Sequence, residues 1–290
     1  MKRYRIIYIM LIPIVLYFAV FSYYPLYLGI KSSFMESKLI GEPQFVGLQN
    51  YFNVVKDSLY SQALVNTLIV GIGTFLARFA LGLAIALSIN EIKNKVFKAA
   101  TQSVTYLPYL LSWAVVGGMW ITILSNTGML NALLRMILGD SFRPLVFMAE
   151  ARFARAIMIF TGAWKDAGYY AVLFLAAIVS IDQTIYEAAA IDGASRMKQI
   201  LFITIPNLTG TMKVITVLGS MSVLRNFDQI FVMGNASIFD EVKNLLYLIY
   251  QNGITEFKVG IATAGATLLL ILTFIISYIV RKVTRYDQHD

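Results

Sequence analysis

Long apolar runs are the feature that most constrains this chain. Six stretches are each about 20 residues or longer, the length that an α-helix needs to cross the hydrocarbon core of a bilayer. Hydrophobic residues make up 58% of the 290 residues and charged residues only 14%, a balance far from that of a soluble domain. We therefore predict an all-α integral membrane protein with six transmembrane helices in a single transmembrane domain, residues 1–290. The predicted spans are residues 6–30, 63–90, 99–124, 153–181, 208–233 and 257–280.

The positive charges lie beside the apolar runs. The formal net charge is +8, which in a soluble protein would suggest a nucleic-acid partner. Here Lys93, Lys95 and Lys98 separate the second and third runs, and Arg281 and Arg285 follow the sixth. This is the distribution of cytoplasmic loops in membrane proteins, so we predict no nucleic-acid partner and place both termini in the cytoplasm.

Several kinds of chemistry are excluded by composition. The chain has no cysteine and a single histidine, His289, near its C-terminus. Thiolate metal sites and cysteine nucleophiles are therefore impossible, and histidine-based sites have only one candidate. No GxxxxGK[ST] phosphate-binding loop is present. We predict no catalytic residue, no metal site and no cofactor in this chain, and no ATP hydrolysis by it.

The polar segment between the fourth and fifth runs, residues 182–206, contains an unusual loop. Residues 187–191 are strong helix formers, and Gly193 permits a bend. Ser195 is placed to cap a second helix over residues 196–203, and Pro206 is placed to start the next element. The segment is predicted to form a helix, a bend and a helix in the cytoplasm, a rigid protrusion that a soluble partner can grip.

This loop resembles the EAA loop of the permease subunits of bacterial ABC importers, and YEAAAIDGAS at residues 186–195 is similar to the carbohydrate branch, the maltose-type and multiple-sugar permeases. FVGLQNY at residues 45–51 extends the resemblance to an external loop. Ile205 stands where the family usually has leucine before the proline. The resemblance implies that seven residues contact the ATPase: Glu187, Ala188, Ala189, Asp192, Gly193, Ile203 and Pro206.

The same resemblance implies the type I ABC importer permease fold and a set of partners in the bacterial cell membrane. Two copies of an ABC ATPase would bind ATP and Mg²⁺, and an extracellular solute-binding protein or lipoprotein would deliver a sugar or oligosaccharide. A second permease, either a homologue or a copy, would complete the pathway, which lipid surrounds. In this scheme ATP-driven closure of the ATPases pulls on the EAA loops and alternates access.

Ionisable residues inside membrane spans are costly and are candidates for function. Lys165 and Asp166 lie about 23 Å from the cytoplasmic end of their span, and Arg225 about 26 Å from that of the next span. Asp228 lies farther out, so the two charged pairs fall at similar heights in the outer half of the membrane. Aromatic rings and amides nearby are suited to sugars. We therefore predict a sugar site that includes Trp164, Lys165, Asp166, Tyr169, Arg225, Asn226 and Asp228.

In maltose-type permeases the helices before and after the EAA loop hold the sugar. Counting from the motif carries the family's sugar-contacting positions onto Gly162, Lys165, Asp166, Tyr169, Gly219 and Val223. Only Tyr169 keeps a typical sugar-binding residue type, which implies a cargo other than maltose.

Two interpretations of the charges remain open. Lys165 and Arg225 neutralise a carboxylate of a uronate-containing oligosaccharide, or they pair with Asp166 and Asp228 and leave the site neutral. Arg78, in the second span, is interpreted as a structural ion pair or as a side chain that reaches lipid headgroups.

Two other functional classes compete with the importer. An ion-coupled secondary solute carrier would show inverted repeats and carboxylates near the bilayer midplane, and neither is evident in the sequence. A membrane enzyme would need a catalytic constellation that the residues inside the spans do not supply.

Overall fold

The computed structural model describes residues 5–36, 42–139 and 141–284, and the side chains from Tyr8 onward within these ranges. Arg285 and His289 lie outside the described residues. The described chain is helical apart from irregular loops and one antiparallel pair of two-residue strands, β1 (Met35–Glu36) and β2 (Gln44–Phe45). The predicted all-α membrane class is confirmed, with this short hairpin as an addition.

Contacts divide the chain into two compact units, residues 1–61 with 245–272, and residues 62–244 with 273–290. In the first unit the Asn50 side chain donates to the carbonyls of Ser33 and Met35, both at 2.9 Å, and Asn252 donates to the Tyr60 hydroxyl at 2.9 Å. The first two bonds hold the chain at the start of the hairpin, and the third joins two residues 192 positions apart in the sequence. The helices of this unit are α1 (Arg5–Phe18), the π-helical turn η2 (Ala19–Tyr23), α2 (Tyr24–Ser33), α3 (Gln49–Lys56), α15 (Leu245–Tyr250), the π-helical turn η4 (Gln251–Thr255) and the start of α16 (Val259–Val283).

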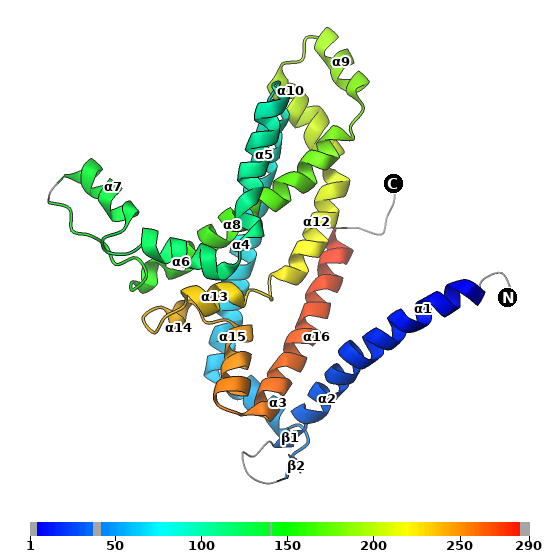
Figure 1. Cartoon of the computed structure of the whole chain (residues 1–290), viewed down its shortest axis with the longest axis vertical. Helices are drawn as coiled ribbons and strands as arrows, with labels where there is room; N and C mark the ends of the chain where they lie inside the picture. The colour runs from blue at the N-terminus through cyan, green and yellow to red at the C-terminus, as the bar shows by residue number, and fades with distance from the viewer. Residues whose placement is uncertain (1–4, 37–41, 140, 285–290) are drawn as a thin grey trace. The chain divides into compact units, whose positions relative to one another are not determined.

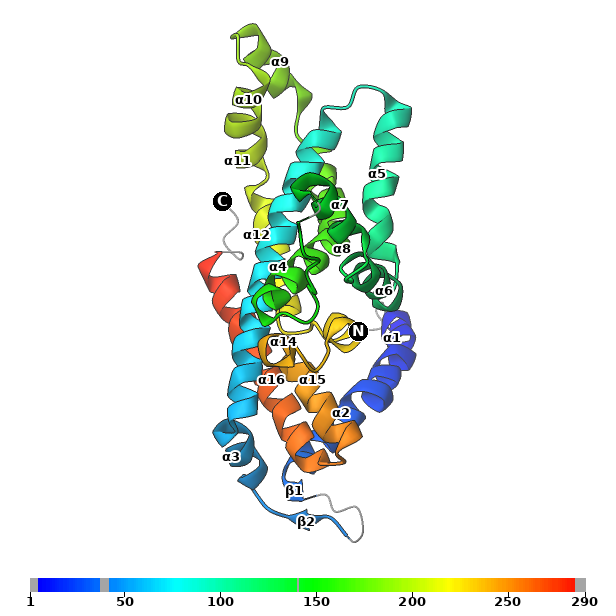
Figure 2. The ribbon, with the colours of Figure 1, turned by 90° about the vertical axis from the view of Figure 1, so that its left-hand side faces the viewer.

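The second unit holds the predicted sites. Its core packs three helices together, α4 (Ser58–Asn90), α8 (Ala151–Val179) and α12 (Thr209–Ser222). The buried residues in this contact include Ala86, Phe174, Ile178, Ile215 and, just before α12, Leu208. Figure 1 shows α9 and α10 at one end of α12 and α13 at the other, and Figure 2 agrees. The helices are α4 (Ser58–Asn90), which begins in the first unit, α5 (Lys95–Leu110), α6 (Trp113–Ile123), α7 (Met129–Leu138), α8 (Ala151–Val179), α9 (Gln183–Ile191), α10 (Arg196–Gln199), the π-helical turn η3 (Ile200–Thr204), α11 (Ile205–Asn207), α12 (Thr209–Ser222), α13 (Asp228–Met233) and α14 (Phe239–Val242).

Within the described residues, three helical segments are long and apolar enough to cross a membrane, Tyr8–Ser33, Ser58–Asn90 and Val259–Val283. Three bent pairs of helices meet the same criteria: α5 with α6, α8 with α9, and the run Arg196–Asn207 with α12. With one span for each pair, the architecture has six spans.

The third predicted span, residues 99–124, is not one straight helix. It breaks between α5 and α6, whose axes differ by 98°. Pro108 and the Gly117–Gly118 pair are residues that permit bending in a helix, but the break falls at Leu111 and Ser112, where the Ser112 hydroxyl accepts the Val115 N–H and caps α6. A side chain that caps a new helix stabilises the break, whereas a glycine pair only tolerates one.

The fifth predicted span, residues 208–233, also differs. The helix α12 ends at Ser222, residues 223–227 are not helical, and α13 begins at Asp228. Tertiary hydrogen bonds hold this break: the buried Gln229 amide donates to the Met158 carbonyl and to the Thr161 hydroxyl, both at 2.8 Å, and Asn244 donates to the Asn226 carbonyl. The break therefore depends on partners far away in the sequence.

Candidate transport cavity and coupling loop

The segment predicted to be a helix, a bend and a helix has that structure. The first helix, α9, starts at Gln183, four residues earlier than expected, because the Asp182 carboxylate accepts the Thr184 N–H at 2.9 Å and caps it. The same hydrogen bond holds the pKa of Asp182 below its ordinary value. Gly193 makes the bend with a φ of +76°, a left-handed conformation that favours glycine. The Ser195 hydroxyl accepts the Lys198 N–H and caps the second helix, as predicted.

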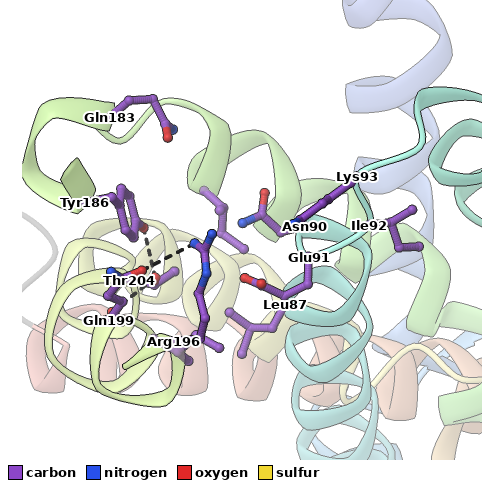
Figure 3. Close-up of a pocket in the computed structure, with 12 residues that line it drawn as sticks. Leu87, Asn90, Glu91, Ile92, Lys93, Gln183, Tyr186, Arg196, Gln199 and Thr204 are labelled. Atoms are coloured by element: carbon purple, nitrogen blue, oxygen red, sulfur yellow. Dashed lines mark hydrogen bonds between the residues drawn. The ribbon is translucent and has the colours of Figure 1, made fainter. Parts of the chain in front are cut away.

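The two halves of the loop are tied together. The Tyr186 hydroxyl on the first helix and the Thr204 hydroxyl on the second lie 2.8 Å apart, and Thr204 and Gln199 are both buried. Behind the loop is a cavity of about 240 Å³ (Figure 3), into which Glu91 and Arg196 extend from opposite sides. These contacts brace the two halves of the loop against each other.

The residues that the resemblance assigns to the ATPase contact lie mostly on the outer surface of this loop. Glu187, Ala188, Asp192, Gly193 and Pro206 are exposed, and Ala189 and Ile203 are partly buried. A Cβ atom built on Gly193 would meet nothing within 4 Å, so the space above the bend is open in the chain alone. The loop therefore offers a protruding surface to a partner.

A second cavity, of about 190 Å³, lies where α4, α6, α8 and the break after α12 meet. Four of the predicted sugar-site residues line it: Gly162, Asp166, Arg225 and Asn226. The other lining residues are not among the ten predicted sugar-site residues; they are Gly71, Thr74, Arg78, Trp113, Ser222 and Gln229. The spacing of Gly71, Thr74 and Arg78 on one helical face was a signal for three of them, whereas Trp113 and Ser222 depend on the two helix breaks.

The six other predicted sugar-site residues do not line this cavity. Tyr169 stacks on Tyr109 with ring centroids 4.7 Å apart, and Trp164 meets the Trp120 ring edge to face at 5.4 Å. The remaining four have different surroundings: Lys165 lies beside the cavity, Gly219 packs against Phe75, Val223 is buried against Gly71, and Asp228 is exposed at the first turn of α13.

Lys165 is buried but is not paired with an acid among the described residues. Its ammonium group donates to the Tyr109 carbonyl at 3.0 Å and lies 5.4 Å and 5.6 Å from the ring centroids of Tyr109 and Trp113. Carbonyl and ring faces stabilise a cation without cancelling its charge. The positive charge of Lys165 therefore remains next to Trp113, one wall of the cavity.

Asp166 pairs with Arg78 instead. The Arg78 Nη1 atom lies 2.8 Å from the Asp166 carboxylate, Nη2 donates to the Ser222 hydroxyl, and the guanidinium lies 4.9 Å from the centroid of the Tyr170 ring. The interpretation of Arg78 as a structural ion pair is confirmed, but Arg78 also lines the cavity, which we did not expect. The alternative pairing, in which Lys165 and Arg225 neutralise Asp166 and Asp228, is wrong for the residues that the structure describes, because none of these pairs lies within 4.0 Å.

Comparison with known proteins gives one family. The model of the binding-protein-dependent transport system inner membrane component family matches residues 78–285. Protein LplB of Bacillus subtilis is 31% identical, with 99% of this chain and 91% of that protein covered. The polygalacturonan/rhamnogalacturonan transport system permease YteP of the same organism is 26% identical, with 92% and 86% covered. The arabinooligosaccharides transport system permease AraP of B. subtilis is 30% identical, with 96% and 88% covered.

Solved structures agree. A chain of a bacterial ABC transporter that imports the acidic polysaccharide alginate superposes with a TM-score of 0.88 at 29% identity, with 98% of this chain and 96% of that chain covered. A chain of a bacterial alginate ABC transporter in complex with an alginate pentasaccharide-bound periplasmic protein also gives a TM-score of 0.88, at 28% identity, with 98% of this chain and 95% of that chain covered. These relatives argue against the ion-coupled carrier and the membrane enzyme. The chain belongs to the binding-protein-dependent transport system inner membrane components and is the permease subunit of an ABC importer for sugars or oligosaccharides.

Proposed function

We propose that this permease imports acidic, uronate-containing oligosaccharides and that an ATPase drives it through the coupling loop, residues 182–206. The observation that best supports an acidic cargo is the uncompensated positive charge at the cavity. Arg225 lines the cavity, is exposed and forms no ion pair among the described residues, and Lys165 adds a second cation behind Trp113. A cation without an acid beside a cavity favours an anionic ligand, and most strongly where the cation is buried, as Lys165 is.

Two similar proteins transport acidic saccharides, which supports an acidic cargo for this permease. One transports polygalacturonan and rhamnogalacturonan, whose galacturonate units carry carboxylates, and one imports alginate. Neutral oligosaccharides, as in the arabinooligosaccharide permease, are the competing cargo. In our proposal, residues 1–290 act as one permease domain that forms half of the pathway, and a second permease, homologous or identical, forms the rest.

The rest of the assembly follows from the same proposal. An extracellular binding protein presents the saccharide at the outer mouth. ATP and Mg²⁺ bind to two separate ATPase subunits, and their closure moves the braced loop and the spans attached to it. Glu187 anchors the contact to a basic group of the ATPase, and the small residues Ala188 and Gly193 allow close approach. This chain itself catalyses no reaction.

Removing the two uncompensated cations tests the cargo. In a variant carrying Lys165→Gln and Arg225→Gln, we expect uptake of a galacturonate oligomer to fall at least about tenfold, because each lost charge-assisted hydrogen bond is worth about 1.5–3 kcal/mol. Uptake of a neutral oligosaccharide of the same length should change little. The measurement is uptake by proteoliposomes that contain the whole importer and its binding protein.

Lys213→Gln is the matched control, because Lys213 lies on α12 and does not line the cavity. It should leave both uptakes unchanged. An equal loss for acidic and neutral oligosaccharides in the double variant would remove the acidic cargo from the proposal.

The side of the membrane on which the coupling loop lies can be measured directly, because the native chain has no cysteine. Ile191 is 87% exposed at the end of α9. In Ile191→Cys, a membrane-impermeant maleimide is expected to label inside-out vesicles and not intact cells. Ile137→Cys is the opposite control, because Ile137 is 77% exposed on α7, between the third and fourth predicted spans, which the same topology places outside. Labelling of Ile191→Cys from outside would refute the coupling role.

A further inference from the structure

A cavity separates the coupling loop from the end of α4. It is the cavity of about 240 Å³ described above, which we call the coupling cavity: α9, α10 and η3 form one wall, and the last turn of α4 with the residues after it forms the other. None of the seven residues assigned to the ATPase contact lines it. The loop therefore stands between the proposed ATPase contact and a space into which it can be pushed.

Two opposite charges face each other across the coupling cavity. Arg196, the first residue of α10, extends into it from the loop, and Glu91, the residue after α4, extends into it from the other wall (Figure 3). The two side chains are not within the 4.0 Å of an ion pair, and neither forms one with another residue in the described part of the chain. They are complementary partners that this structure keeps apart.

Each charge is fixed to the wall that carries it. The backbone N–H of Glu91 donates to the Leu87 carbonyl at 3.4 Å, which continues the last turn of α4. Arg196 begins α10 directly after the Ser195 cap, and its guanidinium donates to the Gln199 side-chain oxygen at 3.4 Å. A movement of the loop therefore carries Arg196 with it, and a force on Glu91 acts on α4.

The coupling cavity can narrow at little cost. Its walls include the amides of Asn90, Gln183 and Gln199, and a polar space of this kind is suited to water, which can leave as the walls approach. Glu91 and Arg196 are both exposed, so solvent screens their attraction at the present separation. Narrowing shortens the distance between the charges and removes the water that screens them, and both changes favour an ion pair.

The helix α4 connects the coupling cavity to the cavity of about 190 Å³ that holds the candidate sugar site. It is one unbroken helix, Ser58–Asn90, and Glu91 follows its last residue. Gly71, Thr74 and Arg78 on the same helix line the candidate sugar site. A push on the end of α4 therefore reaches a wall of that site without passing through a flexible link.

We propose that Glu91 and Arg196 form an ion pair when the ATPases close, and that through this pair the coupling loop pushes α4 and so moves a wall of the transport cavity. Both are positioning residues, because they act through α4 and not on the cargo. This inference rests on the proposed function, in which an ATPase drives the loop. It gives the turn after α4 a role in coupling that the family resemblance did not assign.

Exchanging the two charges tests the pair. Glu91→Arg and Arg196→Glu each place like charges across the cavity, so we expect the number of galacturonate trimers imported per ATP hydrolysed to fall at least about fivefold. The double variant restores opposite charges and should recover to within about twofold of wild type. The measurement is uptake and ATP hydrolysis by proteoliposomes that contain the whole importer and its binding protein. A lower yield of folded protein reduces both rates and leaves their ratio unchanged.

Lys95→Glu is the matched control for Arg196→Glu. Lys95 is exposed at the start of α5, four residues after Glu91, and it does not line the coupling cavity. The variant makes the same change of charge in the same predicted cytoplasmic region. Its ratio of import to ATP hydrolysis should remain that of wild type.

A cross-linking measurement needs no cargo. Because the native chain has no cysteine, Glu91→Cys combined with Arg196→Cys gives this subunit two thiols, one on each wall of the coupling cavity. A short bifunctional thiol reagent should link them in purified importer trapped with ATP and vanadate, and should link them much less in nucleotide-free importer. Mass spectrometry of the linked peptides measures the difference.

The outcomes separate this ion pair from the proposed function. A double exchange that is no better than the single variants, or cross-linking that is the same with and without nucleotide, would overturn the Glu91–Arg196 pair alone. Labelling of Ile191→Cys from outside would overturn the coupling role of the loop, and the pair with it.

Discussion

Gly168→Val is expected to prevent this protein from reaching a stable folded state in the membrane. Gly168 lies where α8 crosses α5. A Cβ atom there would lie against the Thr105 carbonyl oxygen and 2.8 Å from the Tyr106 Cα atom. These are backbone atoms, which cannot rotate away, so the two helices must separate. We expect a loss of about 3 kcal/mol or more, seen as a lower melting temperature and yield of the detergent-purified complex.

The Gly168→Ala variant shows whether the steric clash or the reduced backbone entropy of the unfolded state has the larger effect on stability. In an exposed helix, Gly→Ala is stabilising by about 1 kcal/mol because it reduces backbone entropy in the unfolded state. At Gly168 the clash should reverse that sign, because even the first side-chain carbon does not fit. Separation of α5 and α8 would also displace the Tyr109 carbonyl that binds Lys165.

Gly118→Val is the matched control. Gly118 lies on α6, and a Cβ atom there would meet nothing within 4 Å. This variant should fold and remain thermally stable. A Gly168→Val protein as stable as Gly118→Val would contradict the close packing of α5 and α8.

Gly193→Asp is expected to abolish import in a protein that still folds. The position has a left-handed φ of +76° and open space around it. Aspartate and asparagine tolerate this conformation better than other side chains, so the fold should survive. At the proposed ATPase contact, however, the new carboxylate would be buried without a partner, which costs several kcal/mol. We expect uptake and transport-coupled ATP hydrolysis to fall by more than about tenfold.

Gly193→Asn separates charge from conformation, because it has nearly the same size and the same tolerance of positive φ. It should be less impaired than Gly193→Asp. Glu187→Ala, which removes only the proposed anchoring charge, should also be milder than Gly193→Asp. Wild-type uptake in Gly193→Asp would mean that no partner approaches the bend closely.

Local signals explain why the coupling loop was predictable. Ser195 caps the second helix through a neighbour three residues away, and Gly193 turns the chain by its own backbone freedom. The Asp182 cap is as local as these two, although we expected the first helix to start four residues later. Each of these interactions is contained in a few consecutive residues. The same holds for the apolar runs, whose length alone indicates helices that cross a bilayer.

The cavity was only half predictable, because its walls come from positions far apart in the chain. The charges at residues 165, 166 and 225 were evident in the sequence, but their pairing was not. Asp166 forms its ion pair with Arg78, 88 residues away, and not with its neighbour Lys165. The Lys165 ammonium group instead donates to the Tyr109 backbone carbonyl and lies against the rings of Tyr109 and Trp113.

By itself the sequence determined that this chain is a helical membrane protein with a helix, a bend and a helix between its fourth and fifth apolar runs, because hydrophobic length and helix capping act over neighbouring residues. Only the tertiary structure decided where α12 breaks, which acid Arg78 binds and which residues surround the cavity. Those features depend on hydrogen bonds between helices, such as Gln229 to the Met158 carbonyl, and no local pattern specifies which helices meet.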